Sequence, residues 1–519
     1  MGAVERNLRE MEQTRERYWL RYPATSPVKL RWRALTVRHG FHVLPGESIL
    51  ELGAGSGLWT QHLTGVLRGE NPITAVTFNQ DLCDEGRAKD LPNVEFITVD
   101  SLDALPAESF DYVVGTAILC HDEYARNLRA LHRLLKPGGQ LLFFEANYWN
   151  PQVWVKNTIR PVGRWTGQAS CQIGMRRYQL MHATSQQGYT HVEVIPYDIV
   201  HPRTPRRLIK AAQAVGFVLE HAKGIRDLCG TLYIWARKPG DEEARRPRPS
   251  LAEHAALEGQ VSVVVPCHNE EMNVEPLVET LLRFYDPYIH EIVIVDDNST
   301  DRTAEVTLAV AAQEPRVKLV KRSPPNGVGR ALRAGYRAAT GRYILTMDSD
   351  FVQIVPEFRD LFDAVARGHQ GAIGSRFSHE SMLVNYPFFK IVCNRGFHVL
   401  ANLLLPGRMR DISNNLKLYE AHILKNLDIV EPHFAANAET GLKPLLAGYD
   451  IVEVPVSWIN RTMDMGRSSF HVVRVAPAYF GALVRMVSAA WRGRIRRGPG
   501  EEPAARVEAV AAPAHDRTP

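Results

Sequence analysis

The chain has 519 residues, of which 45% are hydrophobic and 23% are charged, as in globular proteins with two or three domains. The formal net charge is only +5, and no basic tract is interleaved with aromatic residues, so the composition argues against nucleic acid as a partner. No run of about 18 uninterrupted apolar residues occurs, so we expect no membrane span, and six singly scattered cysteines predict reduced thiols in a cytosolic protein.

In chain order, the first 22 residues are rich in charge, which predicts a surface helix and gives no sign of a signal peptide. Short β-branched runs then alternate with helical stretches. We expect strands near 48–52, 73–78, 94–98, 110–115 and 139–145 in the first half, and near 261–265, 291–296, 317–321, 342–347 and 451–457 in the second. Strand–helix alternation of this kind predicts α/β domains with largely parallel sheets.

Between the halves, the stretch from Lys238 to Ser250 is polar, charged and rich in proline, which predicts an interdomain linker. The stretch after Arg497 is rich in Gly, Pro, Glu and Ala without periodicity, which predicts disorder. The expected organisation is therefore a first domain over 1–237, a linker over 238–257, a second domain over 258–497 and a disordered tail over 498–519.

A glycine-rich turn, Glu51-Leu52-Gly53-Ala54-Gly55-Ser56-Gly57, follows the first expected strand and precedes a helix expected from Trp59 to Leu67. Glycines allow a tight turn and bring backbone amides close to a ligand. Alone, this pattern also fits a dinucleotide site or a turn that binds nothing. Three later segments narrow the choice: Asn79 follows the second strand, Asp100 and Ser101 follow the third, and Lys136-Pro137-Gly138-Gly139 precedes the fifth.

In this order the segments over 48–146 resemble class I S-adenosylmethionine-dependent methyltransferases, which have a Rossmann-like fold. The resemblance implies S-adenosylmethionine as cofactor. The roles that it implies are contact with the methionine part by Glu51, Gly53, Gly55 and Gly57, with the ribose by Asn79, and with the adenine by Asp100 and Ser101. The family usually has an acid where Asn79 stands, and an amide holds ribose hydroxyls less strongly than a carboxylate does.

The methyl acceptor cannot be identified from these residues. His121, after the fourth strand, is a candidate catalytic base. Aromatic side chains between residues 147 and 205 could line a sugar or lipid pocket, or form core. A domain that has the methyltransferase fold but no activity, and that recruits a partner, stays open as an alternative.

In the second half, three polar clusters each follow an apolar run. They are Cys267-His268-Asn269-Glu270 after Pro266, the stretch from Asp296 and Asp297 to Asp301, and Asp348-Ser349-Asp350. Ligands of open α/β sheets bind outside the carboxyl ends of the strands, which predicts a nucleotide at these clusters. Two carboxylates at i and i+2 can hold one hard cation, such as Mg²⁺ or Mn²⁺, that bridges a diphosphate.

These clusters, with Asn326-Gly327-Val328-Gly329-Arg330 before the third, resemble family 2 glycosyltransferases of the GT-A fold. The similarity is greatest to polyprenyl-phosphate sugar transferases of the dolichol-phosphate mannosyltransferase type. It implies donor contacts by Pro266, Asn269, Glu270, Asp296, Asp297 and Asp348, a metal on Asp348 and Asp350, and phosphate contacts by Arg376, Arg395 and Arg461. The planar guanidinium fork suits a phosphate.

Three positions leave the acceptor chemistry open. Val352 stands where that type has glutamine, with Gln353 one residue later, so the third metal ligand is undetermined. Ser413-Asn414-Asn415-Leu416-Lys417 replaces a Ser-Gly-Phe-Arg stretch, so the acceptor site can differ. Glu439 is the candidate general base for a hydroxyl acceptor and is otherwise structural, because a phosphate acceptor is already an anion and needs no base.

Two apolar stretches point to a membrane surface. From Phe388 to Leu405, the polar residues Lys390, Asn394, His398 and Asn402 recur every four positions, which gives a helix with a narrow polar stripe. Such a helix is either buried core or lies in the bilayer interface. The stretch from Ala478 to Trp491 is also apolar, and arginines follow it, as in segments that lie near anionic headgroups.

Together these features predict a bifunctional enzyme, peripheral on the inner face of the cytoplasmic membrane. The C-terminal half would transfer a hexose from a nucleotide sugar to a polyprenyl phosphate or another lipid-linked acceptor. The N-terminal half would methylate the sugar, the lipid-linked product or another metabolite. The alternative is a glycosyltransferase that acts on a growing polysaccharide, joined to a non-catalytic methyltransferase-like scaffold.

Overall fold

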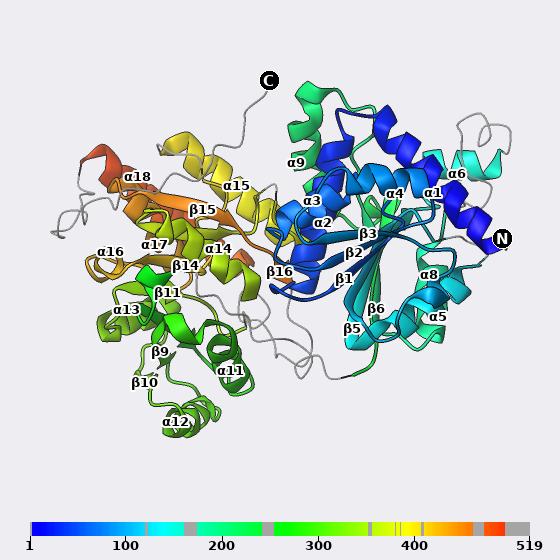
Figure 1. Ribbon diagram of the computed structural model, residues 1–519. Helices are drawn as coiled ribbons and strands as arrows, with labels where there is room; N and C mark the ends of the chain where they lie inside the picture. Colours follow the sequence, from blue (N-terminus) through cyan, green and yellow to red (C-terminus); the bar gives the residue numbers. More distant parts are fainter. Residues whose placement is uncertain are drawn as a thin grey trace. The chain divides into compact units, whose positions relative to one another are not determined.

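The computed structural model describes residues 3–119, 123–159, 174–240, 254–350, 355–378, 380–384, 386–405, 409–459 and 472–493. The chain forms two compact units, drawn in Figure 1. The first unit comprises Met1–Ser250, His379–Val392 and Ser457–Asn460, and the second comprises Leu251–Ser378, Cys393–Val456 and Arg461–Pro519. The domain limits drawn from the sequence remain predictions.

The first unit contains a seven-stranded sheet of order β3-β2-β1-β4-β5-β7-β6. Its strands are β1 (Ile49–Leu52), β2 (Ile73–Thr77), β3 (Val94–Thr98), β4 (Phe110–Thr116), β5 (Leu135–Ala146), β6 (Thr190–Tyr197) and β7 (Thr231–Arg237). The first five pair in parallel, at or near the predicted positions. β7 pairs antiparallel with both β5 and β6, so the expected parallel sheet has an antiparallel edge.

Helices cover both faces of this sheet. They are α1 (Ala3–Arg21), α2 (Ser26–Phe41), α3 (Thr60–Val66), α4 (Gln80–Arg87), α5 (Tyr124–Leu134), α6 (Pro151–Thr158), α8 (Arg177–Gln186) and α9 (Ile209–Leu219). Successive strand residues point to opposite faces: Leu50 and Val113 enter a core with α5 and α8, whereas Ile49 and Val114 enter a core with α2 and α3. The unit is therefore a three-layer α/β/α structure.

The prediction of a surface helix over the first 22 residues is wrong for α1. Met11 and Trp19 join the two cores, and Glu12, Arg15 and Glu16 are buried as well. Charged residues are seldom buried unless they are paired. Here the charged side chains find hydrogen-bonding partners at the carboxyl ends of β1, β2 and β4.

The second unit contains a seven-stranded sheet of order β10-β9-β8-β11-β14-β12-β15. Its strands are β8 (Val261–Cys267), β9 (Ile289–Asp296), β10 (Val317–Lys321), β11 (Tyr343–Thr346), β12 (Gly371–Ser375), β14 (Lys417–Glu420) and β15 (Ile451–Pro455). β10, β9, β8 and β11 are parallel, and β14 is antiparallel to β11 and β12. A separate two-stranded sheet, formed by segments of the first unit, joins β13 (Leu383–Val384) to β16 (Trp458–Ile459).

The helices that follow these strands are α11 (Val274–Tyr285), α12 (Thr303–Gln313), α13 (Val328–Ala338), α14 (Val355–Ala366), α15 (Phe388–Leu404), α16 (Ala421–Lys425), α17 (Ala436–Leu446) and α18 (Val472–Trp491). α13 lies directly on the sheet, since a methyl group at Gly335 would come within 2.4 Å of Val264 Cγ1. This close packing fixes the start of α13 near the carboxyl ends of β8 and β9.

Candidate functional site

The carboxyl ends of β8 and β9 bring two of the predicted donor clusters together. The Asn269 amide donates to Ser299 Oγ at 3.0 Å, and Asn269 Oδ1 accepts from the Thr300 amide at 2.8 Å. The Glu270 amide donates to Thr303 Oγ1 at 2.8 Å. Pro266 lies within β8, one residue before the end of that strand. Because β8 and β9 are parallel neighbours, the two loops emerge at the same edge and brace each other.

Asp296 and Asp297 lie at this edge in different surroundings. Asp296 Oδ1 accepts from the Ser299 amide at 2.9 Å, whereas its buried Oδ2 has no hydrogen-bond partner among the described residues. Asp297 accepts from the Gly327 amide at 2.5 Å and pairs with Arg322. A buried oxygen without a partner costs about 1–3 kcal/mol. Asp296 is therefore ready to accept a hydrogen bond from a ligand, while Asp297 holds the loop before α13.

Asp348 follows β11, and its carboxylate is held from the antiparallel neighbour β14. The register pairs Thr346 with Lys417, which places Asp348 opposite Asn415. Asn415 Nδ2 donates to Asp348 Oδ1 at 2.7 Å. Asn415 was not among the predicted site residues. The sequence pointed to Asn415 only through its place in a segment that departs from the resembled family. Its contact with Asp348 could not be read locally, because the two residues are 67 positions apart.

The donor set at Asp348 and Asp350 fits a hard divalent cation. Both residues offer carboxylate oxygens, which Mg²⁺ and Mn²⁺ prefer. Among the described residues no cluster of three or more His, Cys, Asp or Glu side chains could hold a metal ion alone. One or two carboxylates suffice where substrate phosphates and waters complete the shell, as in Mg²⁺-dependent phosphate enzymes. Val352 and Gln353 lie outside the described residues.

Two of the three predicted phosphate arginines come together on one aromatic ring. The guanidinium groups of Arg376 and Arg395 lie 5.7 Å and 5.3 Å from the Phe377 ring centroid. Arg376 also forks onto Asp411, with Nε 2.7 Å from Oδ2 and Nη2 3.0 Å from Oδ1. Arg395 Nη1 donates to the Arg410 carbonyl at 2.9 Å. These contacts orient both cations, and Arg461 lies outside the described residues.

Asp411 is the buried anion of this group. Burial alone would raise its pKa, but the charge and hydrogen bonds of Arg376, together with His398, outweigh burial and lower the pKa to about 2. Lys417, at the start of β14, is also buried, and burial lowers its pKa to about 7. Lys417 Nζ donates to the Asn437 carbonyl and to Thr440 Oγ1, each at 3.0 Å. Lys417 thus ties the start of β14, the strand beside Asp348, to α17.

Glu439 is engaged in contacts within the second unit. Its Oε2 accepts from the Glu431 amide at 2.8 Å, and its Oε1 pairs with Lys443 Nζ at 2.8 Å. The side chain is buried in α17. These contacts favour the structural role that the sequence left open beside that of a general base.

In the first unit, the glycine-rich turn leaves β1 in the conformation that glycine favours. The φ angles of Gly53, Gly55 and Gly57 are +69°, +58° and +80°. Glu51, at the preceding strand, is buried, and burial raises its pKa to about 7. The turn from Gly53 to Gly57 is itself buried, and the acid beside it faces the interior.

The residues predicted to contact ribose and adenine follow β2 and β3. Asn79 caps α4, since its Oδ1 accepts from the Asp81 amide at 3.0 Å. Ser101 caps a short 3-10 turn by accepting from the Asp103 amide at 3.2 Å. Asp100 is exposed, and His121 lies outside the described residues. Each cap engages one side-chain oxygen of a residue that the resemblance assigns to the cofactor.

α1 supplies the contacts that the sequence did not predict. Glu12 Oε1 accepts from the Gly55 amide at 3.1 Å, and Oε2 accepts from the Phe78 amide at 3.0 Å. Arg15 donates to the Thr116 carbonyl at 3.0 Å and to the Gly53 carbonyl. Glu16 accepts from Ser56 Oγ. The charge pattern of residues 1–22 was the available signal, but it predicts a solvated helix equally well.

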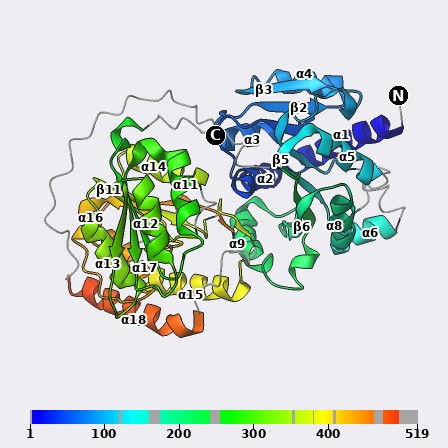
Figure 2. The same ribbon diagram turned by 90° about the horizontal axis from the view of Figure 1, so that it is seen from below.

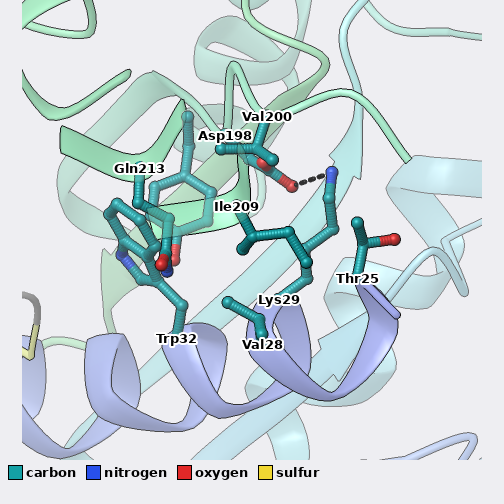
Figure 3. Close-up of a pocket in the computed structure, with 9 residues that line it drawn as sticks. Thr25, Val28, Lys29, Trp32, Asp198, Val200, Ile209 and Gln213 are labelled. Atoms are coloured by element: carbon teal, nitrogen blue, oxygen red, sulfur yellow. Dashed lines mark hydrogen bonds and ion pairs between the residues drawn. The ribbon is translucent and has the colours of Figure 1, made fainter. Parts of the chain in front are cut away.

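A pocket opens at the carboxyl end of β6 (Figure 3). Its lining residues are Thr25, Val28, Lys29, Trp32, Tyr197, Asp198, Val200, Ile209 and Gln213. Lys29 Nζ pairs with Asp198 Oδ2 at 2.8 Å, drawn as a dashed line in Figure 3. Of the aromatic residues considered between 147 and 205, Tyr197 lines this pocket, whereas Trp149 and Trp154 are exposed.

In the second unit, α15 and α18 pack on each other and share one apolar cluster (Figure 2). The Phe397 and Tyr479 rings meet edge to face at 5.5 Å. Three side chains of the polar stripe of α15 bond the segment that follows this helix: Asn394 donates to Ser413 Oγ, the buried His398 accepts at Nε2 from the Ile412 amide, and the exposed Asn402 bonds Met409. Exposed large apolar side chains on the two helices are Phe388, Phe389, Val392, Val399, Leu403, Leu404, Phe480, Val484 and Trp491.

Within the described part of the chain, no helix combines the length and apolar character that crossing a bilayer requires. Cys83, Cys229, Cys267 and Cys393 are free thiols, as the scattered spacing predicted.

Comparison with known proteins identifies two families. Residues 262–428 match the family described as "Glycosyl transferase family 2", and residues 49–139 match a "Methyltransferase domain". The polyprenol monophosphomannose synthase of Mycolicibacterium smegmatis is 26% identical over 46% of this chain and 89% of its own length. The dolichol-phosphate mannosyltransferase of Pyrococcus furiosus is 32% identical over 30% of this chain, which spans 44% of that relative.

Solved structures are more distant. Glucosyl-3-phosphoglycerate synthase from Mycobacterium tuberculosis, in complex with phosphoglyceric acid, is 20% identical, covers 49% of this chain and 88% of its own, and has a TM-score of 0.35. From the family matches and the sheets, the chain joins a methyltransferase-like Rossmann fold to a GT-A fold, in the predicted order. Both domains indicate a transferase.

Proposed function

We propose that the second unit transfers a hexose from a nucleotide sugar to the phosphate of a polyprenyl or other lipid-linked acceptor. The observation that carries this proposal is the meeting of Asp296, Asp297 and Asp348 at one edge of the sheet, with Asp348 held by Asn415. The names of the two relatives, both polyprenol or dolichol phosphate sugar transferases, support this acceptor class.

The chain's own residues supply positioning and charge. Asp348 and Asp350 would hold Mg²⁺ or Mn²⁺, which would neutralise the leaving nucleoside diphosphate when bound. Arg376 and Arg395 concentrate positive charge beside Phe377 for an acceptor phosphate. A phosphate acceptor needs no general base, in keeping with the paired state of Glu439. Direct displacement on an α-linked donor would invert the anomeric carbon.

The lipid part of the proposal rests on α15 and α18. An amphipathic helix of a water-soluble protein normally turns its polar face outward. α15 departs from this in part: His398 is buried and bonds the Ile412 amide, while Val399 and Leu403 face solvent. Arg485 and Arg492 lie on or just after α18. This surface suits the interface of an anionic membrane, where apolar side chains enter the acyl boundary and arginines remain at the headgroups.

The first unit would bind S-adenosylmethionine and methylate the sugar, the lipid-linked product or another metabolite. The glycine-rich turn after β1 and the family match support this assignment. A non-catalytic scaffold is the second candidate, and the seating of α1 on that turn favours it. Titration of the full chain with S-adenosylmethionine separates the two, because a scaffold would give no binding at millimolar cofactor.

The transferase proposal is tested with the full chain, Mn²⁺, a polyprenyl phosphate and a panel of radiolabelled nucleotide hexoses. One donor should give a lipid-extractable product. Asp350→Asn should abolish the transfer, whereas Asp286→Asn, an exposed aspartate paired with Arg316, should leave it intact. Full activity in the Asp350 variant would mean that the metal is held elsewhere. Product formed only on a soluble polysaccharide would favour the alternative acceptor.

A further inference from the structure

Three charged side chains of α1 occupy the hydrogen-bonding groups of the glycine-rich turn and its neighbouring strands. The Arg15 guanidinium bridges the Gly53 and Thr116 carbonyls, at the ends of adjacent strands β1 and β4. The Glu12 carboxylate takes the Gly55 and Phe78 amides. Glu16 takes the Ser56 hydroxyl. The helix thus offers a cation to carbonyl oxygens and anions to N–H and O–H donors.

The methionine part of S-adenosylmethionine carries the same pair of groups, an ammonium and a carboxylate. An ammonium can only donate hydrogen bonds and a carboxylate can only accept them. Such a ligand on this turn would need the carbonyl oxygens and amides that α1 already holds. We propose that α1 is an internal ligand of the cofactor site, and that Arg15, Glu12 and Glu16 must leave the turn before S-adenosylmethionine binds. The proposal rests on the methyltransferase function proposed above.

The packing leaves no layer for a ligand between α1 and the turn. A methyl group built on Gly55 would lie 2.6 Å from Glu16 Oε2, and one on Gly53 would lie 3.0 Å from Arg15 Nη1. All three α1 side chains are buried, and Glu12 has no exposed surface. The helix and a cofactor at the turn are therefore mutually exclusive.

Molecules in which α1 contacts the turn, here called the closed state, should not bind the cofactor. Cofactor binding should therefore weaken as the closed fraction increases. When only a fraction of molecules is competent to bind, the apparent Kd rises by the inverse of that fraction. Removing the Arg15 contacts destabilises only the closed state. If Glu12 and Arg15 instead bound the cofactor directly, their removal would have the opposite effect and weaken cofactor binding.

Calorimetric titration of the full chain with S-adenosylhomocysteine distinguishes these cases. Arg15→Ala should bind about tenfold more tightly than the wild type, because the closed state loses the charge-assisted hydrogen bonds that hold α1 on the turn. Arg17→Ala is the matched control, because Arg17 is exposed on the same helix and donates to the Gln13 carbonyl, away from the turn. Unchanged or weaker binding by Arg15→Ala would overturn the proposal.

Hydrogen exchange on the wild-type protein gives a second readout that needs no variant. S-adenosylhomocysteine should speed hydrogen exchange of the α1 amides from Met11 to Trp19, because the helix loses its contacts with the turn. Ligand binding with unchanged or slower exchange there would refute displacement while leaving the methyltransferase proposal standing. No binding heat from wild type or Arg15→Ala would instead refute the methyltransferase proposal, and this one with it.

Discussion

Replacing Asn415 by alanine should weaken metal-dependent transfer without disturbing the donor loops. Asn415 Nδ2 donates to Asp348 Oδ1 at 2.7 Å, and both residues are reached from the paired strands β11 and β14. The substitution removes one hydrogen bond that fixes the orientation of a proposed metal carboxylate. Outer hydrogen-bond partners of metal ligands typically contribute about 10–100-fold in metal affinity.

The magnitude follows from the same contact. A hydrogen bond to a charged group contributes about 1.5–3 kcal/mol. At 1.4 kcal/mol for each factor of ten, this corresponds to a rise of roughly 10–100-fold in the Mn²⁺ concentration for half-maximal transfer. The maximal rate at saturating Mn²⁺ should fall less, because the carboxylate itself remains.

Asn414 provides the matched control. It is as buried as Asn415 and also donates one bond of 2.7 Å, but to the Gly374 carbonyl. Asn414→Ala should therefore cost a similar amount of folding stability and leave the Mn²⁺ requirement unchanged. Mn²⁺ titrations of lipid-product formation and urea denaturation of both variants give the two quantities. A half-maximal Mn²⁺ concentration for Asn415→Ala within about threefold of that for Asn414→Ala would refute the assigned role.

Three further outcomes follow from burial and exposure. Burial raises the pKa of Glu51 from 4.5 to about 7, so the folded state holds a proton that the unfolded state loses across that window, and stability falls as pH rises. Glu51→Gln lacks this titration, so its free energy of unfolding relative to that of the wild type should rise by up to about 3 kcal/mol as the pH increases from about 4 to 8. Urea denaturation measures both free energies, and a difference that does not change with pH would contradict this. Burial lowers the pKa of Lys417 from 10.5 to about 7, so the unfolded state binds the extra proton and stability rises with pH across that window. In the wild type this increase in the free energy of unfolding is about 5 kcal/mol at most, and Lys417→Met should lack it. If the free energy of unfolding changed with pH equally in both proteins, the lysine would not be neutral in the fold. Leu403→Glu should reduce sedimentation with anionic vesicles, whereas Leu308→Glu on α12, also an exposed leucine, should not; equal loss would point away from the α15 surface.

Much of the fold could be predicted because its central strands carry their own signal. β8 and β9 are β-branched runs bounded by polar clusters, and both were expected within a few residues of their limits. β14 has the short sequence Lys417-Leu418-Tyr419-Glu420, in which no alternation separates two faces. It is a strand because β11 and β12 pair with it from both sides. Such pairing between distant segments leaves no local pattern.

The same division holds for the candidate sites. Asp296, Asp297 and Asp348 follow apolar strands, so their position at one edge could be predicted from chain order. The burial of Glu12 and Arg15 could not be, because a charged helix usually faces water and the groups that reverse this preference belong to other strands. For α15 the polar period predicted an amphipathic helix, but a period alone cannot say which face the protein covers.

The antiparallel register of β11 and β14 makes the contact at Asp348 independent of the stretch of chain that lies between the two strands. Asp348 and Asn415 meet because the strands pair Thr346 with Lys417, although the two residues are 67 positions apart along the chain. The intervening stretch contains β12 and α15, with Arg376 and the outward apolar side chains. Insertions, deletions or exchanges between the two strands can therefore retarget the acceptor surface while the donor carboxylate keeps its partner. A one-residue slip between these strands, in contrast, would break the contact however well the rest of the chain is conserved.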